Sequence, residues 1–261
     1  MRLDRDKYIG HIQDKSKIME MKKVIDKIEI VCNNHSIETT DFLDPYERKL
    51  AKSILNSFDE ISYYETGGLK EAERRIIVIY PYYYDKENIE DYIIGLKAEG
   101  NLERLSHKDF LGAILHLGIK RSKIGDILIH GNYVEIIVKK EISDFLLLNL
   151  DRVSNGKVKT CIISLDQVSP SKIDYKEIKL TLSSLRLDVL ISSTYNLSRQ
   201  ESQNIIKSGK VKVNWEPIDK SSKDLEEGDI VSIKGYGRCI LYSIEGFSKK
   251  GRIKSTVRIL I

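Results

Sequence analysis

Residues 185–214 read LRLDVLISSTYNLSRQESQNIIKSGKVKVN, and this stretch decides the fold of the last third of the chain. Its pattern predicts two helices followed by a short strand. The second helix begins at Ser198, where Glu201 completes a capping box of the S-x-x-E type. It ends before Gly209, a typical helix stop. Residues 211–214 then alternate apolar and polar side chains, as a strand with one buried face does.

The second helix and the strand after it both carry hydrogen-bond donors. Arg199, Gln203 and Lys207 follow one another at four-residue spacing and so share one face of the helix. Lys210 and Lys212 alternate with inward-pointing valines. The N-terminus of the helix adds backbone N–H groups and a positive dipole end, which suit a phosphate. If the helix stripe and the strand face adjoin, they form one basic surface, although each charge taken alone also fits a solvated surface. The expected contacts are Arg186, Ser198, Arg199, Gln200, Gln203, Lys207, Lys210, Lys212, Asn214 and Arg238.

The charge distribution points to the same third of the chain. The 261 residues hold 43 Lys and Arg against 39 Asp and Glu, a net charge of +4. Residues 180–261 alone hold 14 basic against 9 acidic residues, so the remainder is close to neutral. This asymmetry favours a polyanionic partner, with nucleic acid the first candidate.

The region before it predicts a domain that alternates strands and helices. A hairpin is expected at Gly131-Asn132, between two apolar runs. The predicted elements are strands at 76–80 and near 93–98, a helix at 106–117, strands at 126–130 and 133–138, a helix at 141–150 and a strand at 158–163. The order strand, helix, strand, strand, helix, strand is that of a ferredoxin-like sandwich, the fold of RNA recognition motifs. Only Tyr133 supplies an aromatic ring to the third of its strands, so the base-stacking platform of such motifs is absent or altered.

The first region is predicted to be mostly helical. Met21, Ile25 and Ile28 recur at helical spacing, and Asp44 with Pro45 reads as a helix start. We therefore expect an α+β protein with three domains, namely a helical N-terminal domain at 1–75, an RRM-like (ferredoxin-like) domain at 76–179 and a helix pair on a small bent sheet at 180–261.

Composition excludes several classes of protein. No apolar run approaches the ~18 residues of a membrane span, and the start of the chain shows no apolar secretory segment. The three cysteines and five histidines show no metal-ligand spacing. We expect a cytoplasmic protein with reduced thiols, without cofactor or metal, and monomeric.

The stretch at 185–214, together with Gly228-Asp229, resembles the S4 domain, a small module that binds structured RNA. The resemblance extends to the YlmH family of bacterial S4 proteins. Residues 215, 232–238 and 248–252 match its C-terminal domain. Residues 107–112, 117–121 and 123–127 match its middle domain, and 42–43, 67–68 and 71–75 match its first domain. Lys108 stands where arginine is usual, and a lysine does not clamp phosphate bidentately.

Beside these matches, a basic loop follows the first helix of the middle domain and is either a phosphate contact or a solvated loop. The loop and the matched segments give a second set of candidate RNA contacts: His107, Lys108, Lys120, Arg121, Lys123, Lys249, Lys250 and Arg252.

The family resemblance implies binding to the large ribosomal subunit, with contacts to 23S rRNA and to tRNA, in the rescue and quality control of stalled translation. An alternative is a cell-division protein that acts through protein partners and binds RNA secondarily. Catalysis is not expected, because Arg186-Leu187-Asp188 lies inside the S4 match with no catalytic domain behind it, and no glycine-rich cofactor loop follows a strand.

Overall fold

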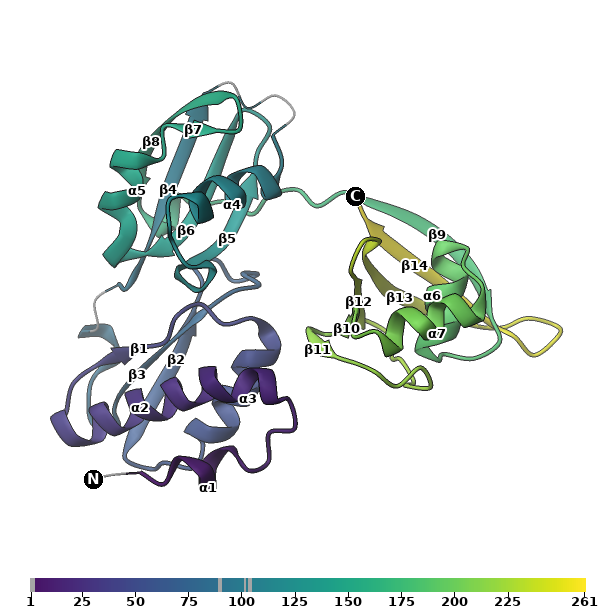
Figure 1. The fold of residues 1–261 in the computed structure, drawn as a ribbon, viewed down its shortest axis with the longest axis horizontal. Helices are drawn as coiled ribbons and strands as arrows, with labels where there is room; N and C mark the ends of the chain where they lie inside the picture. Colours follow the sequence, from purple (N-terminus) through teal and green to yellow (C-terminus); the bar gives the residue numbers. More distant parts are fainter. Residues whose placement is uncertain (1–2, 89–90, 101, 103–104) are drawn as a thin grey trace. The chain divides into compact units, whose positions relative to one another are not determined.

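The computed structural model describes residues 3–88, 91–100, 102 and 105–261 (Figure 1). The chain forms two compact units, Met1–Lys172 and Ile173–Ile261, and each is described by itself. Within the described ranges, no helix combines the length and the apolar character that crossing a membrane requires.

The first unit begins with three helices on a three-stranded sheet. They are α1 (Arg5–Ile9), α2 (Ile18–Asn34) and α3 (Pro45–Leu55), on strands β1 (Glu38–Thr39), β2 (Ile61–Thr66) and β3 (Ile76–Pro81) in the order β1-β3-β2. The predicted start of α3 is confirmed by two hydrogen bonds. The Asp44 carboxylate accepts from the Glu47 N–H at 2.8 Å, and the Glu47 carboxylate accepts from the Asp44 N–H at 2.8 Å. The predicted apolar stripe of α2 is buried in the core under this sheet.

The position of β3 corrects the predicted boundary at residue 75. The sequence assigns this strand to the middle domain, but it hydrogen-bonds to β1 on one side and to β2 on the other. All six of its residues are buried, because one face packs on the helices and the other meets the middle domain. Val78 and Tyr80 share an apolar cluster there with Ile93 and Ile137. Because every residue of the strand is apolar, its sequence alone does not show whether it belongs to the sheet of the first domain or to that of the middle domain.

The middle domain has the predicted ferredoxin-like topology. Its elements are β4 (Ile93–Gly100), α4 (His107–His116), β5 (Ile124–Ile129), β6 (Tyr133–Lys139), α5 (Ser143–Asn149), β7 (Arg152–Val153) and β8 (Gly156–Ile163). The sheet order is β5-β6-β4-β8-β7 with antiparallel pairs throughout. Both helices cover one face, where Phe110 and Leu146 meet Leu96 and Ile136.

The first domain covers part of the other face of this sheet. Asp126 on β5 accepts backbone N–H bonds from Glu73 at 2.7 Å and Arg74 at 3.1 Å. The Lys139 ammonium donates to the Thr40 carbonyl at 3.2 Å, and burial lowers the pKa of Lys139 to about 8. A Cβ on Gly125 would lie 2.7 Å from the Phe42 ring. The two domains of this unit are therefore in close contact.

The second unit is a helix pair on a six-stranded sheet. It comprises β9 (Tyr175–Leu182), α6 (Leu187–Tyr195), α7 (Arg199–Lys207), β10 (Val211–Val213), β11 (Glu216–Pro217), β12 (Ile230–Ile233), β13 (Gly237–Phe247) and β14 (Ile253–Leu260). The sheet order is β11-β10-β12-β13-β14-β9. Leu190 and Ile206 from the helices pack on Val211, Val231 and Leu241, so both helices lie on one face of the sheet.

This unit begins earlier than the predicted residue 180. Strand β9 was not predicted, and it pairs along its whole length with β14, from Tyr175 opposite Leu260 to Leu182 opposite Ile253. Residues 173–179 therefore belong to the C-terminal unit.

Candidate nucleic-acid interface

A buried carboxylate organises the start of both helices in the second unit. Asp188 is fully buried and accepts from Arg186 Nε at 3.0 Å and Nη2 at 3.1 Å, from Arg199 Nε at 3.2 Å and from Gln203 Nε2 at 2.8 Å. Burial by itself raises the pKa of Asp188, but the bonds from Arg186, Gln203 and Arg199 outweigh it and lower the pKa to about 2. The Arg199 side chain stays 56% exposed, so its outer nitrogens remain accessible to a ligand.

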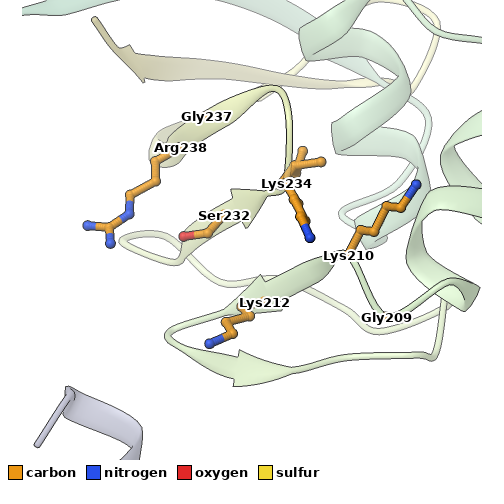
Figure 2. A pocket seen from close by; sticks show the side chains of 8 residues that line it. Gly209, Lys210, Lys212, Ser232, Lys234, Gly237 and Arg238 are labelled. Carbon is orange, nitrogen blue, oxygen red and sulfur yellow. The ribbon is translucent and has the colours of Figure 1, made fainter. Parts of the chain in front are cut away.

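A second group of cations lines a hollow of about 370 Å³ (Figure 2), formed by Gly209, Lys210, Lys212, Ser232, Ile233, Lys234, Gly237 and Arg238. We call it the basic hollow. Lys212 on β10 pairs with Ser232 on β12, which pairs with Arg238 on β13. Because side chains of paired residues lie on the same face of a sheet, these three form a row across adjacent strands.

A second pair of lysines adjoins this row. The Lys234 N–H donates to the Lys210 carbonyl at 2.9 Å, which brings their side chains beside the row (Figure 2). Among the described residues, no carboxylate forms an ion pair with Lys210, Lys212 or Lys234. The hollow is therefore a concave site of concentrated positive charge, which a phosphate group would neutralise.

An aromatic ring stands beside the hollow. The guanidinium carbon of Arg238 lies 5.4 Å from the centre of the Trp215 ring, a cation–π contact. Trp215 and Asn214 both have positive φ angles, 68° and 49°. The Asn214 side chain stabilises this turn, because it donates to Asp229 Oδ1 at 2.7 Å and accepts from the Ile230 N–H at 3.0 Å. Asn214 therefore stabilises the turn beside the hollow, and it is itself exposed, so its direct contact with RNA stays a prediction.

The predicted residues do not form the single platform that the sequence suggested. Val211 and Val213 face the core beneath the helices, so Lys212 between them points to the opposite face of the sheet. Arg199 and Gln203, in contrast, are held on the helix side by Asp188. The structure thus gathers the candidates into two groups, one at Asp188 and one in the basic hollow.

The other candidates on α7 occupy its two ends. Ser198 is the N-cap, since its hydroxyl accepts from the Glu201 N–H at 3.1 Å and its own N–H donates to Glu201 Oε2 at 2.8 Å. The predicted capping box is therefore confirmed. Gln200 and Lys207 are exposed.

Two of the three cations in the basic loop of the middle domain, Arg121 and Lys123, are half-buried and bonded within the protein. Lys123 pairs with Asp41 at 2.7 Å and Glu141 at 2.6 Å. Arg121 donates to the backbone carbonyls of Ile124 and Gly125 at the start of β5, and burial lowers the pKa of Arg121 to about 10. These two predicted phosphate contacts instead stabilise the protein's own structure, while Lys120 beside them is exposed.

The remaining secondary candidates are exposed but lie apart. His107 and Lys108 are in the first turn of α4, where Lys108 lines a hollow of about 500 Å³ with Arg152 and the acids Asp109 and Asp151. That hollow is mixed in charge and suits an anion less well. Exposed cations also occupy the turn between β13 and β14, namely Lys249, Lys250 and Arg252.

The aromatic residue of the ferredoxin-like sheet is already covered. The His130 ring stacks on Tyr133 with centroids 4.6 Å apart, and the Lys97 ammonium lies 4.5 Å from the Tyr133 centroid. The expected alteration of the base-stacking platform agrees with this arrangement.

Two polar side chains of the basic hollow, those of Ser232 and Lys234, were not predicted as contacts. Ser232 and Lys234 lie in the strand region after Asp229, and the sequence shows their alternation with buried Val231 and Ile233. What the sequence does not show is the pairing of β12 with β10, which puts Ser232 beside Lys212.

Known proteins match the chain along most of its length. The family model "YlmH, N-terminal" matches residues 16–84, "Putative RNA-binding domain in YlmH" matches 86–167 and "S4 domain" matches 185–231. The Bacillus subtilis (strain 168) protein named "Ribosome-associated protein quality control protein P2" is 34% identical over 229 residues, which cover 87% of this chain and 89% of that protein.

A solved structure, "Cell division protein ylmH from Streptococcus pneumoniae", superimposes with a TM-score of 0.53 at 19% identity. The superposition covers 60% of this chain and 96% of that chain, and at this identity it shows a similar fold only. The three domain matches and the extent of the Bacillus relative establish the assignment: the chain belongs to the YlmH family and carries a C-terminal S4 domain.

Proposed function

We propose that this protein binds structured RNA of the large ribosomal subunit without catalysing a reaction, and that it acts in the quality control of stalled translation in the cytoplasm. The basic hollow of the S4 domain is the observation that carries the proposal. The name of the Bacillus relative, a ribosome-associated quality control protein, supports the cellular setting. Within that setting, 23S rRNA and a bound tRNA are the proposed RNA partners, and the protein acts as a monomer.

The chemistry of the hollow favours a phosphate backbone over a small anion. Its cations come from strands β10 and β13 and from the segments that follow α7 and β12, so they are spread along a surface and do not converge on one point. A chain of phosphates neutralises several such charges at once and releases its own counterions, which supplies much of the affinity for nucleic acid. The outer nitrogens of Arg199, on α7, offer further donors to the same partner.

The burial of Asp188 supports a role without catalysis. A carboxylate that acts on a base or ribose has to reach the substrate, whereas Asp188 is fully buried and bonded to Arg186, Arg199 and Gln203. This arrangement orders the helix pair and leaves no oxygen of Asp188 facing a ligand.

Sedimentation with large ribosomal subunits tests the proposal. We expect the wild-type protein to co-sediment with large subunits and the double variant Lys212→Ala/Arg238→Ala to remain in the upper fractions. The matched control is Lys157→Ala/Lys159→Ala, which removes two exposed lysines from β8 and should co-sediment normally.

If the hollow variant still co-sediments like wild type, attachment does not run through this RNA site, and the proposal fails. Attachment through a protein partner, as in a cell-division role, would produce that result. Treatment of the wild-type complex with mild RNase should release the protein if RNA holds it.

A further inference from the structure

The turn between β13 and β14 presents a large apolar side chain to solvent. Phe247 is the last residue of β13, pairs with Ile253 and is 72% exposed. The turn after it is well ordered, because the Ser248 N–H donates to the Arg252 carbonyl at 2.7 Å and the Gly251 N–H to the Ser248 carbonyl at 2.9 Å. We call residues 247–252 the hairpin tip.

Four exposed cations follow Phe247 in the chain. Lys249, Lys250 and Arg252 are exposed on the turn, and Lys254 follows at the start of β14. No carboxylate of the described residues forms an ion pair with these four cations. The neighbouring acid Glu245 is engaged, since it accepts from the Thr256 hydroxyl. The hairpin tip therefore combines one exposed aromatic face with uncompensated positive charge.

This combination fits RNA better than other anionic surfaces. An aromatic face stacks on an unpaired base of any sequence, and the adjoining cations neutralise the phosphates on either side of it. A membrane-surface site needs a continuous apolar face along an element. Here the turn residues that follow Phe247 are polar, charged or glycine.

We propose that the hairpin tip is a second RNA contact of this domain, in which Phe247 stacks on an unpaired base while Lys249, Lys250 and Arg252 hold the phosphates beside it. The inference rests on the proposed RNA-binding function and adds the kind of RNA that is preferred, one with an unpaired nucleotide at a defined distance from the hollow. Arg238 and Phe247 are nine positions apart along β13, so the two contacts lie at most roughly 30 Å apart at ~3.3 Å per residue.

The test compares two RNA hairpins of equal length, each with a stem long enough to span the roughly 30 Å between the two contacts. One is fully paired, and the other carries a single unpaired 2-aminopurine nucleotide, whose fluorescence reports stacking. We expect the full-length protein to bind the second hairpin more tightly and to change its 2-aminopurine emission. Phe247→Ala should weaken that binding by roughly 5- to 150-fold, as for loss of one base–aromatic stack. Phe247→Leu should weaken it too, because leucine keeps apolar surface but lacks a π face.

Controls separate the outcomes. Tyr82→Ala removes a ring that is 65% exposed in the other unit, and it should leave both affinities unchanged. Circular dichroism checks that the Phe247 variants are folded. If Phe247→Ala retains the wild-type preference for the unpaired nucleotide while Lys212→Ala/Arg238→Ala loses binding to both RNAs, the hairpin-tip inference is wrong and the proposed function stands. If the wild-type protein binds neither RNA, both fail. Binding of the same variants to phosphatidylserine vesicles is measured in parallel. If Phe247→Ala weakens binding to these vesicles but not to either RNA, the inference is also wrong.

Discussion

Replacing Asp188 with asparagine keeps the shape of the side chain and removes the charge that holds Arg186, Arg199 and Gln203. A pKa of about 2 against an ordinary value of 3.8 corresponds to roughly 2 kcal/mol of folding free energy at pH 7, at ~1.4 kcal/mol per pH unit. The Arg186 and Arg199 side chains are 34% and 56% exposed, so both cations still reach water in the variant. We therefore expect a loss near that figure and below the ~3–5 kcal/mol of a fully buried pair.

The pH dependence of this loss follows from the direction of the shift. A carboxyl group whose pKa is lowered by folding stabilises the protein above its unfolded pKa and loses that contribution as the pH falls toward its folded pKa. The difference in unfolding free energy between wild type and Asp188→Asn should therefore be roughly 2 kcal/mol at pH 7 and about half of that at pH 3. Urea unfolding followed by fluorescence measures it, and Trp215, the single tryptophan, reports the C-terminal unit specifically.

Two results would refute this reasoning. A variant as stable as wild type at pH 7 would mean that the carboxylate gains nothing from its three donors. A stability difference that stays constant between pH 7 and pH 3 would mean that the loss comes from packing and not from the charge of Asp188.

Three further predictions concern other parts of the chain. Lys212→Ala/Arg238→Ala should reduce the slope of log affinity against log salt by about 2 for duplex RNA, since each lost phosphate contact contributes ~0.9. An unchanged slope would show that these two residues do not contact phosphates of the RNA. Arg121→Gln should lower the unfolding free energy of the N-terminal unit by about 2 kcal/mol, because two buried carbonyls lose a charged donor. The same variant should bind RNA as tightly as wild type. A variant that is as stable as wild type but binds RNA more weakly would show that Arg121 contacts RNA. Tyr133→Ala should not alter RNA affinity in a filter-binding assay, since the His130 ring and the Lys97 ammonium already contact the Tyr133 ring. A tenfold loss of affinity would show that the ring is accessible to RNA.

Local patterns carried the successful structural predictions. The capping boxes at Asp44 and Ser198 depend on side chains three residues apart, and both helices begin where these residues predict. The alternation of apolar residues and the turn at Gly131-Asn132 were enough to predict the ferredoxin-like order. In each case the residues that determine the element are neighbours in sequence.

Long-range pairing accounts for what was missed. Strand β9 is stabilised by β14, about 80 residues away, and β3 is placed by pairing with β1 and β2. The same limit applies to the site. The outward direction of Lys212 follows from its valine neighbours, but its proximity to Ser232 and Arg238 depends on strand order, which the local sequence does not contain.

The central claim is that RNA occupies the basic hollow, and lysine footprinting tests it most directly. The full-length protein is treated with an amine-reactive acetylating reagent, with and without large ribosomal subunits, and the modified sites are quantified by mass spectrometry. If RNA occupies the hollow, Lys210, Lys212 and Lys234 become protected while exposed Lys159 on β8 reacts as before. Equal reactivity of the three hollow lysines in the free and the subunit-bound protein would contradict it.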